Sequence, residues 1–253
     1  MRGEYMKTIL FLVLTYMSLL ANVSITEVKY EGGISLFGEV AQADILLQED
    51  LEKHTYKIKV TAYSIGIVKA LTLNRKDIFI SEGKKQDGVY IPYKFTKIVT
   101  KTDYIKKTTY TFDYKNNKVL RQVHKEELVD DSSYDIIKLQ AISNEKLIKS
   151  DESNYIKLQQ NDYLSMFLNL SVNKLKKGTI NYIDQSDSDD VMLISKTMFE
   201  VRKHNGDELY RINISNDASI FFEKAIAVDI AFYGDAYIKK IYEKKSIKNY
   251  FSN

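Results

Sequence analysis

The sequence predicts a mostly β protein built as an antiparallel meander, with one packed helix. Short runs in which apolar and polar residues alternate recur along the chain, and turn signals separate them at intervals of roughly 8–12 residues. β-Branched and aromatic residues dominate these runs, as packing on a pleated surface favours. Apolar residues recur at helical spacing in one stretch, near residues 162–176.

The first 21 residues have the pattern of a secretory signal peptide. Lys7 precedes an apolar run that begins at Ile9 and ends at the small residue Ala21. The run is shorter than the about 20 apolar residues of a membrane span. We therefore expect cleavage near Asn22 and a periplasmic mature protein, residues 22–253, of a Gram-negative bacterium.

Three alternatives to this N-terminus stay open. The leader could remain as an uncleaved anchor. Leu19 is large for the position three residues before cleavage, which favours cleavage slightly later, within residues 22–24. Translation could also start at Met6, since Met6-Lys7 opens a more typical leader than Met1 does.

Composition excludes several classes of protein. The formal net charge is only +3, and a nucleic-acid binder would concentrate basic residues on one surface. Cysteine is absent, so core burial and hydrogen bonds must hold the fold, and an N-terminal lipid on cysteine is excluded. We expect one β-rich domain with no nucleic-acid partner and no stable membrane span after cleavage.

The strand at residues 56–63 has the clearest alternation. Tyr56, Ile58 and Val60 fall on one face, and Lys57 and Lys59 fall on the other, which is the period of a half-exposed strand. Comparable runs occupy residues 77–80, 89–91, 94–99, 107–112, 118–123, 179–183, 191–195, 198–203, 208–214 and 225–233.

Glycine and asparagine mark the turns between these runs. Gly83, in Ser81-Glu82-Gly83, and Gly88, in Asp87-Gly88, are expected where φ must be positive. Residues 113–118 predict a hairpin loop, and residues 205–207 predict another.

Pro92 is the single proline of the chain. Since proline lacks an N–H, we expect it at the first residue or at the edge of a strand. Residues 93–99 should then form a hairpin with residues 108–112 through the connection at residues 101–103.

The helix is expected to begin at Asp162 as N-cap. Tyr163, Met166 and Leu170 lie at helical spacing, and the basic segment that ends at Gly178 indicates its end. The polar stretch at residues 128–158 indicates a variable insertion or a long connection, although Ile136 to Ile142 could form a short helix.

Short landmarks occur in a fixed order along the chain. They are Leu36-Phe37-Gly38-Glu39-Val40, Gly66, Arg75, Ser81-Glu82-Gly83, Asp87-Gly88, Ile91-Pro92-Tyr93-Lys94-Phe95, Phe112-Asp113, Lys118-Val119, Asp162-Tyr163-Leu164-Ser165, Lys177-Gly178 and Asp235. In this order they resemble the exported bacterial proteins grouped as domain of unknown function 3108. The resemblance implies a large antiparallel sheet curled into an open barrel or half-barrel, an exported location and no established reaction. It offers no catalytic residues to carry over to this chain.

Catalytic and metal-binding patterns are weak. The histidines His54, His124 and His204 lie beside charged or turn residues, and no G-x-S-x-G frames a serine. The acidic residues 184–190 have calcium-binding chemistry but lack the glycine and the distal glutamate of an EF-hand, so a solvated hairpin tip is favoured. We expect no enzyme activity, no catalytic residue, no metal and no cofactor.

A curved sheet with an apolar concave face suggests a carrier of lipid or another apolar ligand. Ile58, Val60, Phe79 and Phe95 would line its pocket. The alternative is a non-enzymatic interaction or scaffold protein of the cell envelope, with an envelope protein as partner and the concavity filled by side chains.

Overall fold

The computed structural model describes residues 22–130, 133–135, 140–142, 145–183, 189–203, 209–215, 219–230 and 234–249. The leader at residues 1–21, His204, the loop at residues 205–207 and residues 184–188 of the acidic cluster lie outside the described residues.

In the described part of the chain, fourteen strands form one antiparallel sheet that does not close on itself. Their order is β10-β7-β6-β5-β4-β3-β2-β1-β16-β15-β14-β13-β12-β11. The strands are β1 (Asn22–Ile34), β2 (Gly38–Asp50), β3 (Thr55–Ser64), β4 (Lys76–Gln86), β5 (Val89–Lys101), β6 (Tyr104–Asp113), β7 (Lys118–Asp130), β10 (Glu145–Lys157), β11 (Gly178–Thr179), β12 (Asp189–Ser195), β13 (Met198–Lys203), β14 (Leu209–Ser215), β15 (Lys224–Ile230) and β16 (Gly234–Asn249).

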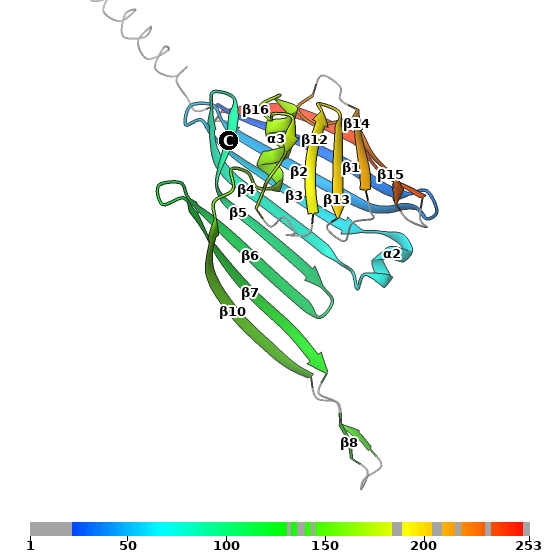
Figure 1. Cartoon of the computed structure of the whole chain (residues 1–253). Coiled ribbons are helices and arrows are strands. Elements are labelled where there is room, and N and C mark those ends of the chain that lie inside the picture. Colours follow the sequence, from blue (N-terminus) through cyan, green and yellow to red (C-terminus); the bar gives the residue numbers. More distant parts are fainter. Residues whose placement is uncertain are drawn as a thin grey trace, which may run out of the picture.

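The sheet curls around one helix. Figure 1 shows α3 (Tyr163–Ser171) on the concave side, with strands β12 to β15 facing strands β1 to β3. A short second helix, α2 (Gly66–Leu71), connects β3 to β4, and β8 (Ser133–Asp135) pairs with β9 (Gln140–Ile142) in a separate hairpin. The prediction of an open, half-barrel-like antiparallel meander with a packed helix is confirmed.

The core lies on the concave face. In β3, Tyr56 and Ile58 are buried while Lys57 and Lys59 are exposed, as the alternation predicts. The buried core around α3 consists of Val28, Tyr30, Leu47, Tyr56, Ile58, Tyr90, Phe95, Tyr110, Phe112, Val119, Leu164, Leu168, Ile183 and Phe221.

Gly83 does not lie in a turn, and this prediction was wrong. It lies inside β4, at the bulge where the register with β5 shifts, and it is not among the residues with positive φ. A Cβ at this position would overlap the carbonyl of Ile91 and approach the ring of Tyr56 to 2.5 Å. Glycine is therefore required by close packing. Gly88 does have a positive φ, +77°, as predicted.

Pro92 lies at a bulge and beside an unpaired stretch of β5. It is buried and faces Gly83 of β4, whereas the pairing of β5 with β6 begins only at Lys94. No ladder bond from β6 is therefore lost at the proline. The predicted hairpin of β5 and β6 forms, with its connection between Lys101 and Tyr104.

Residues 128–158 contain the end of β7 and the whole of β10. β7 continues to Asp130, and β10 pairs with β7 from Glu145 to Lys157. We expected a variable insertion or a long connection here; the strand in it was not predicted because β10 is exposed along nearly its whole length and lacks the alternation on which strand prediction depends. Of the alternative short helix at residues 136–142, residues 136–139 lie outside the described residues and residues 140–142 form β9.

A glycine comparison tests the packing at the bulge. Gly83→Ala should lower the free energy of unfolding by about 3 kcal/mol, because the added methyl group overlaps backbone that cannot move freely. Gly32→Ala is the matched control, since its Cβ would meet no atom closer than 3.5 Å. Urea unfolding measures both; equal losses in the two variants would contradict the packing argument.

Candidate apolar binding cavity

Asp162 starts α3 and fixes its first turn. Its Oδ1 accepts hydrogen bonds from the backbone N–H groups of Leu164 and Ser165, and Ser165 Oγ accepts one from the N–H of Asp162. These bonds form a capping box, which satisfies the free N–H groups of the first turn. The predicted N-cap is thus confirmed.

The helix ends earlier than predicted. It stops at Ser171, and Asn173 takes the left-handed conformation with φ 58°. Asparagine tolerates this conformation, so the helix terminates there. The lysines and Gly178, which were expected to mark its end, lie beyond it.

Buried hydrogen bonds tie α3 to the sheet at both ends. At its start, Ser81 Oγ of β4 donates to Asp162 Oδ2 at 2.6 Å, and Tyr56 Oη lies 3.0 Å from Ser81 Oγ. Further along, the Asn169 amide accepts from the N–H of Tyr90 and donates to its carbonyl. Because all these groups are buried, breaking any one bond would leave an unsatisfied polar group.

Burial also changes the acidity of Asp162. The side chain is fully buried, and this burial raises the pKa of its carboxyl to about 6, although hydrogen bonds from Ser81, Ser165 and Leu164 oppose the rise. The carboxyl therefore changes charge close to neutral pH.

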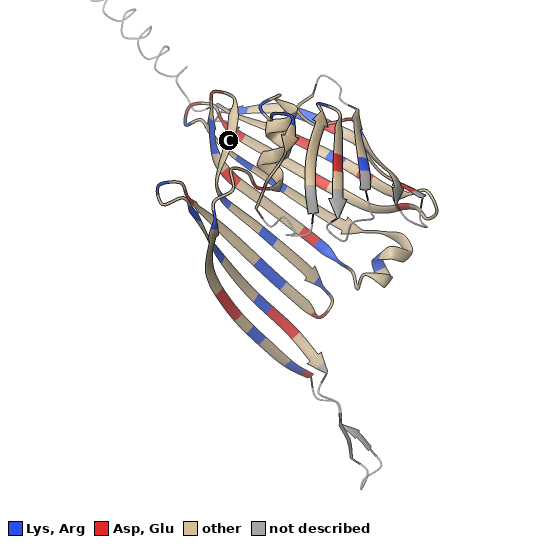
Figure 2. Ribbon diagram, viewed as in Figure 1, with Lys and Arg blue, Asp and Glu red and all other residues tan. Residues whose placement is uncertain are grey.

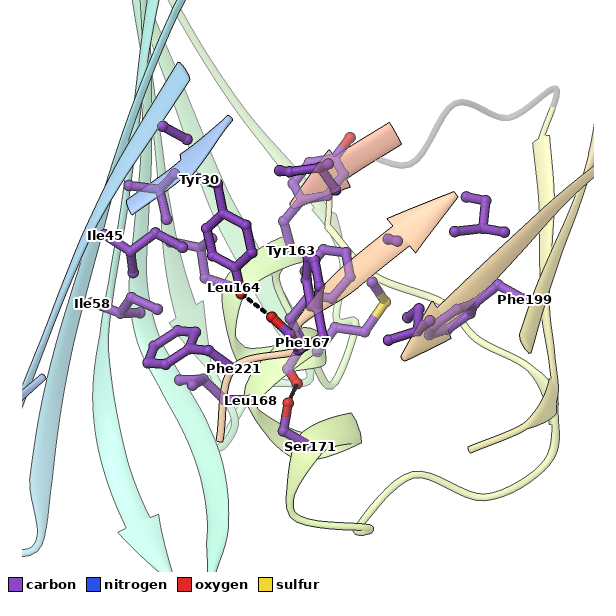
Figure 3. Close-up of a pocket in the computed structure, with 18 of the residues that line it drawn as sticks. Tyr30, Ile45, Ile58, Tyr163, Leu164, Phe167, Leu168, Ser171, Phe199 and Phe221 are labelled. Carbon is purple, nitrogen blue, oxygen red and sulfur yellow. Dashed lines mark hydrogen bonds between the residues drawn. The ribbon is translucent and has the colours of Figure 1, made fainter. Parts of the chain in front are cut away.

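An apolar cavity of about 510 Å³ lies between the sheet and α3. In Figure 3, Tyr30, Ile45 and Ile58 approach it from one side and Phe199 from the other, with the helix between them. Its lining includes Tyr30, Ala43, Ile45, Ile58, Val60, Tyr163, Leu164, Met166, Phe167, Leu168, Tyr182, Val191, Phe199, Val201, Ile212, Ile214, Ala225 and Ile238.

Two polar groups in the lining already have partners. Tyr30 Oη donates to the carbonyl of Phe222 at 2.6 Å, and Ser171 Oγ donates to the carbonyl of Phe167 at 2.9 Å. The lining therefore offers mainly carbon to an occupant.

The four residues predicted to line a pocket fall into two groups. Ile58 and Val60 line the cavity. Phe79 and Phe95 lie behind its wall, with ring centroids 6.4 and 6.0 Å from that of Tyr163. Their alternation placed them on the correct face, but α3 covers that part of the face.

Sequence reasoning missed most of the lining. The helix residues Met166 and Leu168 and the C-terminal strand residues Phe199 and Ile212 come from segments far from β3 in sequence. The apolar alternation in β13 and β14 was the available signal. It did not show that these strands fold over β2 and β3.

Other candidate sites are peripheral. His124 lies 2.8 Å from Asp151 and 3.2 Å from Glu126, and these two carboxylates raise the pKa of its imidazole. His54 is exposed in the turn before β3. In the described part of the chain, no group of three histidine, aspartate or glutamate side chains is arranged to hold a metal.

Comparison with known proteins finds no family model and no curated protein that matches this chain. Among the described helices, none has the length and apolar character needed to cross a membrane.

The raised pKa of Asp162 predicts a pH-dependent stability. Its folded-state pKa, about 6, lies above the ordinary 3.8, so protonation favours the folded state. The contribution is complete below about pH 3.8 and is lost as the pH rises through 6, a change of roughly 3 kcal/mol. Asp162→Asn keeps a good N-cap but should remove this part of the pH dependence.

Urea unfolding of both proteins between pH 4 and 7 measures the difference. Asp113→Asn, at a partly exposed residue, is the control of opposite sign, because the Asn116 side chain lowers the pKa of Asp113. Identical pH profiles for the wild type and Asp162→Asn would contradict the assignment.

Proposed function

We propose that this protein binds an apolar ligand, such as an acyl chain, in the cavity beneath α3. The cavity itself is the observation that supports the proposal. Its volume of about 510 Å³ falls within the range of about 300–1,000 Å³ typical of small-molecule sites.

The chemistry of the lining selects the class of ligand. A polar molecule would lose its hydrogen bonds with water and regain few from a carbon surface. An apolar chain loses nothing comparable, and each buried methylene contributes about 0.8 kcal/mol. Water is itself a poor occupant, because it needs two to four polar partners.

A second candidate is a role in protein interaction, for which β10 is the supporting feature. This strand of 13 residues forms one edge of the sheet and is exposed along most of its length. Leu147, Ile148 and Tyr155 are exposed on it. Such an edge can pair with a strand of an envelope partner.

We further propose that the protein is exported to the periplasm of a Gram-negative bacterium and belongs with the family of domain of unknown function 3108. The leader pattern of residues 1–21 supports export. The ordered landmarks support the family.

Export can be tested independently of binding. Replacing Leu12 and Leu14 with arginine should leave the precursor in the cytoplasm, because charge within the apolar run opposes membrane engagement. Cell fractionation and intact-mass measurement provide the result. Unaltered protein found in the cytosol at full precursor mass would refute the proposed location.

Filling the cavity should weaken ligand binding. Ala43 lines the cavity, and Ala43→Phe should lower the affinity for a fluorescent fatty acid by about tenfold or more by occupying its space. Thr61→Phe is the control, because Thr61 lies in the same strand as Ile58 and Val60 but on the opposite face of the sheet and does not line the cavity.

Thermal unfolding verifies that both variants fold. Native mass spectrometry of protein purified from cells should also detect a co-purifying apolar molecule. Equal binding by the two folded variants would place the ligand elsewhere, and no binding by the wild type would refute the carrier proposal.

A further inference from the structure

A second, basic groove lies on the sheet beyond α3. It has a volume of about 460 Å³, and five of its lining residues are basic while only Asp103 and Glu127 are acidic. The basic residues are Arg75, Lys97, Lys101, Lys106 and Arg121. Figure 2 shows bands of positive residues on strands β5 to β7, outside the area that α3 covers.

The groove and the cavity are on the same concave face. Lys97 follows buried Phe95 by two residues in β5, so both side chains point to one face. The register extends this face to β6, since Lys97 pairs with Thr108 and Val99 pairs with Lys106. The concave face therefore changes from apolar to basic along β5.

Tyr163 connects the two sites. Its side chain lines the cavity, and its ring centroid lies 4.6 Å from that of Tyr182, another lining residue. The same ring has Lys97 Nζ 5.9 Å from its centroid. One tyrosine ring thus contacts a residue of each site.

The groove has positive charge available for an anion. Among the described residues, no carboxylate forms an ion pair with Lys101 or Lys106. Lys101 Nζ lies 6.0 Å from the ring centroid of Tyr104. Lys106 faces Lys125 across β6 and β7, but Lys125 forms an ion pair with Glu127. An anionic group beside Lys101 and Lys106 would form charge-assisted hydrogen bonds with their ammonium groups.

We propose that the ligand is an amphiphile whose apolar chain occupies the cavity and whose carboxylate or phosphate head group binds in the basic groove. This inference rests on the proposed function, because it assumes an apolar chain beneath α3. It adds the charge and the orientation of the ligand, with its head beyond Tyr163 near Lys97 and Lys106.

Ligands that share one chain test the head group. We would measure the affinity of the full-length mature protein for laurate, dodecyl phosphate, dodecanol and inorganic phosphate by calorimetry at pH 8. An anionic dodecyl compound should bind at least about tenfold more tightly than dodecanol, and the difference should shrink with salt. The tighter of the two anions then identifies carboxylate or phosphate.

Matched variants locate the head group. The double variant Lys97→Gln with Lys106→Gln should lower the affinity for the anionic compounds by about tenfold and leave the affinity for dodecanol unchanged. The control is Lys94→Gln with Lys107→Gln, which removes the same charge from lysines of the same two strands that are exposed on the opposite face. It should change the affinity for neither the anionic compounds nor dodecanol.

The outcomes separate the two proposals. Equal affinity for dodecanol and both anions would overturn the head-group site while leaving the apolar cavity in place. Inorganic phosphate binding as tightly as dodecyl phosphate would overturn the amphiphile, because the chain would contribute nothing. Failure of all three dodecyl compounds would overturn this inference and the proposed function together.

Discussion

The hydrogen bond between Ser81 and Asp162 fixes the helix on which the interior of this protein depends. It joins the start of α3 to the middle of β4 at full burial, where water cannot compete. The adjacent residue, Tyr163, is thereby held between the apolar cavity and the basic groove. Leu164 and Leu168, further along the same helix, cover the sheet and close one wall of the cavity. Loss of this contact would remove a buried hydrogen bond that joins the helix to the sheet.

The sequence predicted many of the strands in which one face is buried, but not β1 and β2, although Val28 and Tyr30 of β1 are buried and the neighbouring Lys29 is exposed. β3 and the hairpin of β5 and β6 were predicted by the alternation of apolar and polar residues, and Asp162 predicted the start of α3 because aspartate is a favoured N-cap. β10 was not predicted because both of its faces are exposed to solvent. The long, lysine-rich β16 was not predicted because much of its second half is also exposed. Alternation identifies which face a residue joins but not what lies above it. It therefore could not separate Ile58, which lines the cavity, from Phe95, which packs behind Tyr163.

An open sheet must also limit pairing at its two edges. β11, at one edge, has only two residues, which is too short to recruit a foreign strand easily. β10, at the other edge, is long, and its charged side chains, including Lys149 in an ion pair with Glu126, make uncontrolled pairing unfavourable. The two edges thus limit pairing with other chains by different means, one by its short length and the other by its charged side chains.

The cavity also bears on the hydration of the interior. It has a volume of about 510 Å³, is partly open, and is lined mainly by carbon. Water inside it finds few hydrogen-bond partners, and the carbon atoms of its lining lack the close contacts of a packed core. Without cysteine, the chain has no disulfide to add to its stability. A molecule that bound the folded chain in this cavity, and not the unfolded chain, would therefore stabilise the fold by an amount that rises with its affinity.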